Sequence, residues 1–253
     1  MSILLKSERD IEMLRVSGGV LARILNTLAA SAKEGVHLTE LDAQARELLR
    51  GEGARAAFLG YQPEGSARAY PAALCTSVNN QIVHGVPSKY ALKEGDILKI
   101  DFGVDYKGFI TDGALTVGVG KVSKTAKRLM KVTQEALADG IAACVLGAHL
   151  GDIGYAIEKH AVKNGFGIAS GLTGHGVGFA LHEDPTVYNF GKKGEGMKIV
   201  PGLVIAIEPM FTAGTGDVTQ IKDESYTTRD GSIAAHFEHT VAITERGTEI
   251  LTE

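Results

Sequence analysis

The 253-residue sequence predicts a mixed α/β (α+β) protein that forms one domain over residues 1–253, built from two related halves of about 1–120 and 121–253. Three observations predict this fold class. Segments with helical spacing alternate with apolar runs typical of strands, one block of sequence occurs twice, and no linker or low-complexity segment divides the chain. With 44% apolar and 22% charged residues, the composition suits a globular domain with a substantial core.

The first half opens with two predicted helices. Ser7 and Asp10 are spaced as a capping box, and the apolar residues that follow fall three, four or seven apart: Ile11, Leu14, Leu21, Leu25 and Leu28. A second helix is predicted from about Thr39 to Arg50, because Gly51 and Gly53 follow it and glycine commonly ends a helix.

A loop and three strands are predicted next. The segment "GYQPEGSARAYP" at 60–71 is rich in Gly, Pro and Ser, which predicts a loop. Apolar and β-branched residues predict strands over 72–79, 96–101 and 109–120.

The second half repeats this order. Helices are predicted to begin near Ser123 and near Asp152, the second of them ending at Asn164 and Gly165, and strands are predicted from Ile168 to the end of the chain.

An internal repeat relates the two halves. Residues 34–54 resemble residues 146–166, with His37 over His149, Leu38 over Leu150 and Gly53 over Gly165. A supersecondary unit that occurs twice predicts two halves with the same local structure.

The repeat extends to acidic residues beside the strands. "HGVP" at 84–87 corresponds to "HEDP" at 182–185, Asp101 corresponds to Glu208, and Asp112 corresponds to Glu238. Each half therefore supplies a histidine, an acid at the end of an apolar strand and a second acid at the start of another strand. If the halves pack around a pseudo-twofold axis, their strands meet in one sheet and the four carboxylates converge.

Four converging carboxylates predict a metal site. Like charges raise one another's pKa and buried charge is costly, whereas two divalent cations balance four negative charges. Oxygen ligands with one imidazole suit manganese, iron, cobalt or zinc, and two such ions can share a bridging hydroxide at neutral pH. The candidate imidazole is His175 in "TGHGVG", where the neighbouring glycines allow close approach of the backbone. His84 and His182 are expected near the metals.

Charge and composition argue against several classes of protein. The net charge of −4 argues against a nucleic-acid surface, and no run approaches 18 consecutive apolar residues, which argues against a membrane span. The N-terminus does not have the pattern of a signal peptide, so a cytoplasmic protein is expected. Only Cys75 and Cys144 are present, so any metal must be held by histidine and carboxylates.

The remaining histidines are interpreted as structural or left open. His37, His149 and His160 are expected to be hydrogen-bonded structural residues. His239 follows Glu238 in a predicted strand and would point to the opposite face, so it would miss metals that Glu238 binds. His236 is not assigned.

Seven motifs in order resemble those of type I methionine aminopeptidases over essentially the whole chain: "HGVP" (84–87), "GDILKIDFG" (95–103), "TDG" (111–113), "GHGVG" (174–178), "LHEDP" (181–185), "IAIEPM" (205–210) and "FEHTVAIT" (237–244). The resemblance implies the pita-bread (creatinase/aminopeptidase) fold, a pseudo-twofold curved antiparallel sheet with helices on one side. It implies removal of the initiator methionine from nascent proteins whose second residue is small, by attack of a metal-bridging hydroxide.

The resemblance also implies a role for each site residue. The implied metal ligands are Asp101, Asp112, His175, Glu208 and Glu238. Asp112 and Glu238 would bridge two ions, Asp101 would chelate one, and His175 with Glu208 would hold the other. His84 would contact the scissile amide, His182 would stabilise the oxyanion, and Glu208 would shuttle a proton.

A pocket for the first side chain of the substrate carries over by position, with Phe58, Tyr61, Tyr70, Cys75 and Leu181 as its expected walls. The connection between Tyr61 and Tyr70 is longer than usual in this family. The chain also contains no Trp to cap the pocket, and Ser225 and Tyr226 occupy the stretch where one is expected.

Two alternatives stay open at this point. One is a hydrolase of the aminopeptidase P or prolidase type, which usually carries an added N-terminal domain for which this chain has no room. The other is a pita-bread binding protein without catalysis, against which the intact ligand positions argue.

The expected partners are the N-terminal methionine of nascent polypeptides and the ribosome, and a monomer is expected.

Overall fold

The computed structural model describes residues 3–63 and 65–253, and its four main helices begin where the sequence predicts. Their bounds are α1 Glu8–Ser31, α2 Leu38–Glu52, α3 Lys124–Ala143 and α4 Leu150–Asn164. Ser7 and Asp10 form the predicted capping box at α1. Before α2 and α4, the backbone N–H groups of His37 and His149 each donate to an acid three residues later, at 2.8 Å. The repeated sequence thus repeats its local structure.

Nine strands form the main sheet, in which the path β1-β4-β5-β14-β9-β7-β8 is joined by β15 on β14 and β2 on β4. The bounds are β1 Arg55–Ala56, β2 Cys75–Val78, β4 Ile97–Tyr106, β5 Phe109–Gly118, β7 Gly174–Gly176, β8 Glu183–Val187, β9 Val204–Ile207, β14 Glu238–Thr244 and β15 Gly247–Ile250. Its pairings are antiparallel. Strands from both halves of the chain meet where β5 pairs with β14.

Two small antiparallel sheets complete the described strands, ordered β13-β10-β6 and β11-β12-β3. Their bounds are β3 Gln81–Val83, β6 Gly167–Ile168, β10 Met210–Thr212, β11 Val218–Gln220, β12 Tyr226–Thr228 and β13 Ala234–His236. The sheet of β3, β11 and β12 brings the segment before His84 next to a hairpin more than 130 residues later in the chain.

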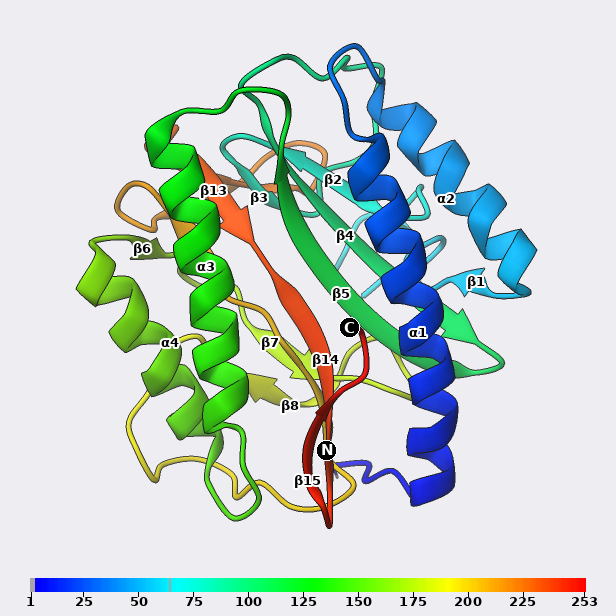
Figure 1. Ribbon diagram of the computed structural model, residues 1–253, viewed down its shortest axis with the longest axis vertical. Helices are drawn as coiled ribbons and strands as arrows, with labels where there is room; N and C mark the ends of the chain where they lie inside the picture. The colour runs from blue at the N-terminus through cyan, green and yellow to red at the C-terminus, as the bar shows by residue number, and fades with distance from the viewer. Residues whose placement is uncertain (1–2, 64) are drawn as a thin grey trace.

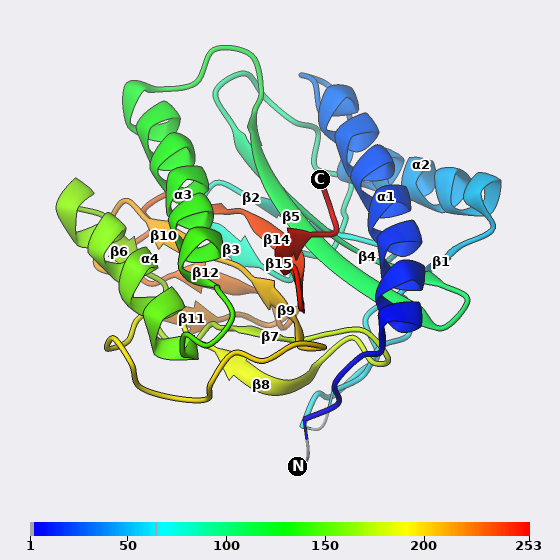
Figure 2. The same ribbon diagram turned by 60° about the horizontal axis from the view of Figure 1, so that its bottom comes forward.

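The helices cover one face of the curved main sheet (Figures 1 and 2), with α1 and α2 over one half and α3 and α4 over the other. Strand alternation explains the two faces. Leu98, Ile100 and Phe102 of β4 pack into the core beneath α1 and α2, whereas Asp101 lines a cavity on the opposite side. The expected curved antiparallel sheet with helices on one side is confirmed.

One expectation about strand ends is wrong. The strand predicted over 96–101 continues past Asp101 to Tyr106, because β4 pairs with β5 over ten successive residues, from Ile97 with Gly118 to Tyr106 with Phe109. Asp101 therefore lies inside a strand. Glu208 follows the last residue of β9, as the sequence predicts.

Candidate active site and metal centre

Five neighbouring strands of the main sheet each bring one predicted ligand to the same region. Asp101 lies in β4, Asp112 in β5 and His175 in β7, Glu238 is the first residue of β14, and Glu208 directly follows β9. In the sheet these strands are ordered β4-β5-β14-β9-β7, so residues more than 120 positions apart in the chain become neighbours.

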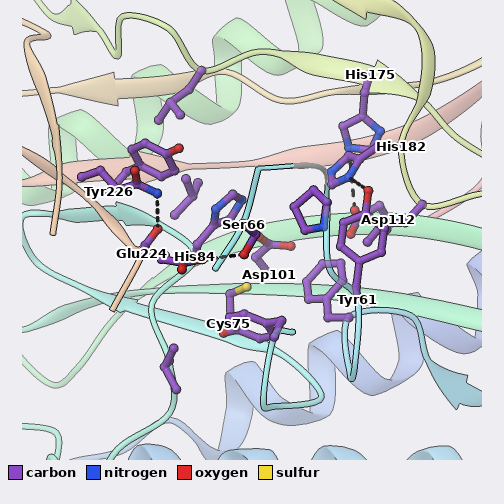
Figure 3. Close-up of a pocket in the computed structure, with 18 of the residues that line it drawn as sticks. Tyr61, Ser66, Cys75, His84, Asp101, Asp112, His175, His182, Glu224 and Tyr226 are labelled. Carbon is purple, nitrogen blue, oxygen red and sulfur yellow. Dashed lines mark hydrogen bonds and ion pairs between the residues drawn. The ribbon is translucent and has the colours of Figure 1, made fainter. Parts of the chain in front are cut away.

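Strand register places the acids on one face. Ala114 of β5 pairs with Asp101 on one side and with Glu238 on the other. Directly paired residues share a face, and Asp112 is two residues from Ala114, so its side chain emerges on that face as well. This face lines a cavity of about 630 Å³ whose walls include all five predicted ligands. Figure 3 shows Asp101, Asp112 and His175 in this cavity.

The potential ligand atoms of these side chains lie close together. His175 Nε2 lies 3.5 Å from Glu208 Oε1 and 3.8 Å from Asp112 Oδ2. Two groups of three residues place their ligand atoms within 4.8 Å of one another: Asp112 with His175 and Glu238, and Glu208 with His236 and Glu238. Glu238 belongs to both groups, and Asp101 belongs to neither.

His236 is the residue of this cluster that sequence reasoning left unassigned. Its Nε2 lies 3.3 Å from Glu208 Oε2 and 3.7 Å from Glu238 Oε2, and the side chain is buried. Burial lowers the pKa of His236 to about 3, so the ring is neutral at pH 7. A signal was present in the sequence: His236 precedes Glu238 by two residues, the spacing that puts two strand residues on one face.

Burial and mutual repulsion raise the pKa values of the four carboxyl groups. The pKa of Asp112 is raised to about 7, mainly by burial. Burial first, and then the neighbouring carboxylates, raise the pKa values of Asp101, Glu208 and Glu238 well above their ordinary range. A protein that gathers four buried acids in this way stabilises them most directly with bound cations.

The donor set fits divalent cations. Among the described residues, Glu238 Oε1 and both ring nitrogens of His236 are buried without a hydrogen-bond partner. Unpaired buried polar atoms are costly, and they are accounted for when a ligand occupies the space between them. Carboxylate oxygens with imidazole are the donors that manganese, iron, cobalt and zinc take.

Close backbone packing explains the glycines around His175. A Cβ atom added to Gly174 would overlap the carbonyl oxygen of Ala206, and one added to Gly176 would overlap that of Asp184. Strand β7 is therefore held tightly between β8 and β9. His175 is fixed further by the backbone, since its Nδ1 lies 2.9 Å from the Gly176 carbonyl oxygen and leaves Nε2 toward the acids.

Two further imidazoles face the cavity. His182 Nδ1 lies 2.7 Å from the Tyr61 hydroxyl oxygen, and its ring lies 4.4 Å from that of His175. His84 packs edge-on against Tyr226, with 5.5 Å between the ring centroids. The pKa values of both His84 and His182 are lowered to about 4, first by desolvation in the cavity wall and then by neighbouring imidazoles. Both rings are neutral at pH 7.

The segment that carries His182 is anchored from two sides. The Glu183 carboxylate accepts hydrogen bonds from the backbone N–H groups of Phe179 and Ala180, at 2.6 and 2.8 Å. It also forms a buried ion pair with Lys6 from the N-terminal segment. The position of His182 is thus fixed on both sides along the chain.

The predicted pocket residues form one apolar cluster. Phe58, Cys75 and Leu181 are buried together, with Tyr61 and Tyr70 packed against them. The cluster also contains Ala57 and Ile110, which sequence reasoning did not identify. Cys75 lies directly opposite Asp101 in the pairing of β2 with β4. Burial raises the pKa of the Cys75 thiol well above its ordinary value, so it is a neutral wall residue.

The other histidines lie outside the cluster. His37 Nδ1 lies 2.8 Å from the Lys89 carbonyl oxygen, and His160 Nδ1 lies 2.8 Å from Asp139. His149 precedes α4 as its N-cap. His239 Nδ1 lies 2.9 Å from the Thr252 hydroxyl, on the other face of β14 from Glu238.

Comparison with known proteins decides the family. The profile of metallopeptidase family M24 matches residues 12–245. The chain belongs to metallopeptidase family M24. A methionine aminopeptidase of Aquifex aeolicus is 45% identical over 259 residues, which cover 100% of both chains. One of Clostridium perfringens is 42% identical over 251 residues, covering 99% of this chain and 98% of the other.

Solved structures agree with this assignment. The crystal structure of methionine aminopeptidase from Thermotoga maritima superimposes with a TM-score of 0.95 at 37% identity, covering 100% of each chain. The resemblance expected from the sequence motifs and the pita-bread fold are both confirmed, and membership of M24 makes this protein a metal-dependent hydrolase. Among the helices in the described ranges, none is long and apolar enough to cross a membrane.

Proposed function

We propose that this protein removes the N-terminal methionine from polypeptides whose second residue is small. One observation carries the proposal: five neighbouring strands converge on a buried cluster of acids and imidazole, and this cluster shares one cavity with an apolar pocket. The two parts match the two requirements of the reaction, which are hydrolysis of an amide and recognition of a long apolar side chain.

Asp101, Asp112, His175, Glu208 and Glu238, which all line the cavity, would hold two divalent cations. When bound, such ions supply a water of lowered pKa and a Lewis acid for the scissile carbonyl. Glu208 is proposed to accept a proton from the attacking water and to pass it to the leaving amine, since its carboxyl lines the cavity beside the other acids.

His182 is proposed to stabilise the oxyanion as a neutral donor. His182 Nδ1 lies 2.7 Å from the Tyr61 hydroxyl oxygen, and in the proposed tautomer this hydroxyl donates to Nδ1 and the ring proton is on Nε2. Because the pKa of His182 is lowered to about 4, the ring is a hydrogen-bond donor rather than an acid at pH 7. His84 is proposed to contact the scissile amide from across the cavity.

Substrate choice follows from the apolar cluster. Phe58, Tyr61 and Tyr70 surround a space suited to an unbranched thioether, and sulfur packs favourably against aromatic edges. Cys75 and Leu181 complete the walls. Methionine is therefore the proposed first residue.

We further propose that the protein acts as a cytoplasmic monomer on nascent polypeptides, with the ribosome as the place of encounter. The net charge of −4 gives the chain no electrostatic preference for nucleic acid, so such an encounter would depend on the peptide or on ribosomal protein.

The test is kcat/KM on Met-Ala-Ser, Met-Lys-Ser, Leu-Ala-Ser and Ala-Pro-Ser, with and without added Mn²⁺ or Co²⁺. Rapid, metal-dependent cleavage of Met-Ala-Ser alone supports the proposal. Preference for Ala-Pro-Ser would favour the aminopeptidase P type instead. A solved prolidase from Pyrococcus furiosus has the same fold, with a TM-score of 0.79 at 21% identity, and this chain covers 65% of it. A protein that binds metal and cleaves none of the four would be a binding protein.

A further inference from the structure

The loop at 62–69 connects two walls of the apolar pocket. Its ends are joined, because Tyr70 N–H donates to the Tyr61 carbonyl oxygen at 2.8 Å and Gly60 N–H donates to that of Tyr70 at 2.9 Å. Residue 64 lies outside the described residues. The described part of the loop lines the same cavity as the metal ligands.

A distant hairpin holds this loop. In the turn between β11 and β12, the Glu224 carboxylate accepts hydrogen bonds from the Ser66 hydroxyl at 2.7 Å and from Ala67 N–H at 3.3 Å. The Arg68 guanidinium donates to the Asp223 carbonyl oxygen at 2.7 Å. We name the contacts of Glu224 with Ser66 and Ala67 the Glu224 latch.

The backbone of Glu224 indicates that its side chain is needed there. Its φ is +68°, in the left-handed region that glycine adopts freely and that residues with a Cβ adopt at a cost. The side chain is half-buried against the loop. A glutamate in a conformation that suits glycine is explained by what its carboxylate does, and here that is to hold Ser66 and Ala67.

The cavity has two ends. His175, His182 and Asp112 lie toward one side of it, and Glu224 and Tyr226 lie toward the other (Figure 3). A peptide that places its first side chain among Phe58, Tyr61 and Tyr70, with its scissile amide near the metal ligands, must leave through the remainder of the cavity. That remainder is bounded by the loop at 65–69 and by the hairpin that carries Glu224.

We propose that Glu224 is a specificity-determining residue: through the Glu224 latch it holds residues 65–69 as a wall beside the residue that follows the scissile bond. This proposal rests on the proposed function and gives a physical origin for a limit on second-residue size. A latched wall cannot withdraw from a branched side chain, whereas a released loop can.

The test compares the ratio of kcat/KM for Met-Ala-Ser to that for Met-Val-Ser in the metal-loaded protein. Glu224→Ala should lower this ratio roughly tenfold, the range in which pocket walls discriminate one or two methyl groups. Ser66→Ala should lower it in the same direction. Because both act through one contact, the double variant should match Glu224→Ala rather than the product of the two effects.

Two controls separate specificity from folding. Lys222→Ala changes an exposed residue of the same turn, which does not line the cavity, and should leave the ratio unchanged. Glu224→Gly removes the latch and also relieves the strained φ, so it should reproduce the altered ratio with an unchanged or higher Tm. An unchanged ratio in both Glu224→Ala and Glu224→Gly would overturn the proposal.

A second readout does not depend on activity. Trypsin cleaves after arginine, so loss of the latch should speed cleavage after Arg68 several-fold in Glu224→Ala, followed by mass spectrometry. Equal cleavage in wild type and variant would show that the latch does not hold the loop. If wild type fails to cleave Met-Ala-Ser, the proposed function fails. The ratio is then measured between Ala and Val as second residue for whichever first residue wild type does accept.

Discussion

Glu238 and His182 occupy different positions in the site, so replacing each should cause a different loss of metal binding or activity. Glu238 belongs to both ligand groups and is buried, so Glu238→Ala should abolish metal binding and activity together. His182 lies beside the cluster and bonds to Tyr61, so His182→Ala should keep its metal and lose about 10²–10³ in kcat. Metal content by atomic emission, measured with kcat on the same samples, distinguishes the two.

Conservative replacements serve as controls for this pair. His182→Gln retains a donor and should recover part of the lost rate, whereas Glu238→Gln keeps the size of the side chain without its charge and should still lose metal. An empty metal site in His182→Ala would show that His182 is a ligand rather than an oxyanion donor.

His236 can be tested as a residue that orients a metal ligand. It lies 3.3 Å from one carboxylate oxygen of Glu208 and, being neutral, can orient that carboxylate without repelling cations. Partners of metal ligands are typically worth 10–100-fold in affinity, so His236→Ala should weaken metal binding by about that factor. Competition with a fluorescent chelator measures it. His239→Ala, whose side chain points to the opposite face of β14 from Glu238, should leave metal affinity unchanged.

At the scale of elements, β7 depends on small residues on both sides of His175. Gly176→Ala would place a methyl group against the Asp184 carbonyl oxygen, and β7 would have to move away from β8. We expect a loss of about 1–3 kcal/mol in unfolding free energy, as is usual for overpacking, together with weaker metal binding. Urea unfolding of the metal-free protein isolates the first effect. Gly171→Ala, where an added Cβ meets nothing within 4 Å but φ is +81°, controls for backbone strain alone.

Helix starts, which have local signals, were predictable, whereas the length of β4, which is set by pairing with a distant segment, was not. The capping box at Ser7 and the N-cap at Ser123 are encoded within four residues, so helix starts agree with the structure. The end of β4 is encoded by its pairing with β5 over ten residues, and nothing near Asp101 reveals that the strand continues. Local sequence sets helix ends, while a neighbouring strand sets strand length.

For the whole molecule, the repeat was the most informative signal because it relates distant residues. Equating Asp101 with Glu208 and Asp112 with Glu238 predicted which acids meet, and the strand order brings them together. Lys99 shows the limit of such reasoning. It is fully buried and donates to the Asn79 carbonyl oxygen at 2.7 Å, a contact without a counterpart in the repeat.

We infer that the two halves form one pseudo-twofold domain.

The stability of the whole molecule should depend on metal and pH together. In the metal-free protein, burial raises the pKa of Asp112 to about 7 and those of Asp101, Glu208 and Glu238 well above their ordinary range. The folded state then holds protons that the unfolded chain has released, so the unfolding free energy falls as pH rises, by about 1.4 kcal/mol per pH unit for each such proton. The lowered pKa values of the cavity imidazoles make the unfolding free energy rise with pH instead, but only below about pH 6.5.

Chelated protein should therefore have a Tm that decreases from pH 6.5 to 8.5. Mn²⁺-loaded protein should have a higher Tm throughout and should not show that decrease, because bound cations favour ionised ligands and stabilise the native state. Differential scanning calorimetry at three pH values, with and without metal, measures both trends. Asp112→Asn removes one of the titrating groups and should flatten the curve of the chelated protein. A Tm that rises with pH after verified metal removal would show that the four carboxylates do not repel one another in the folded state, and the argument for a shared cation site would lose its electrostatic basis.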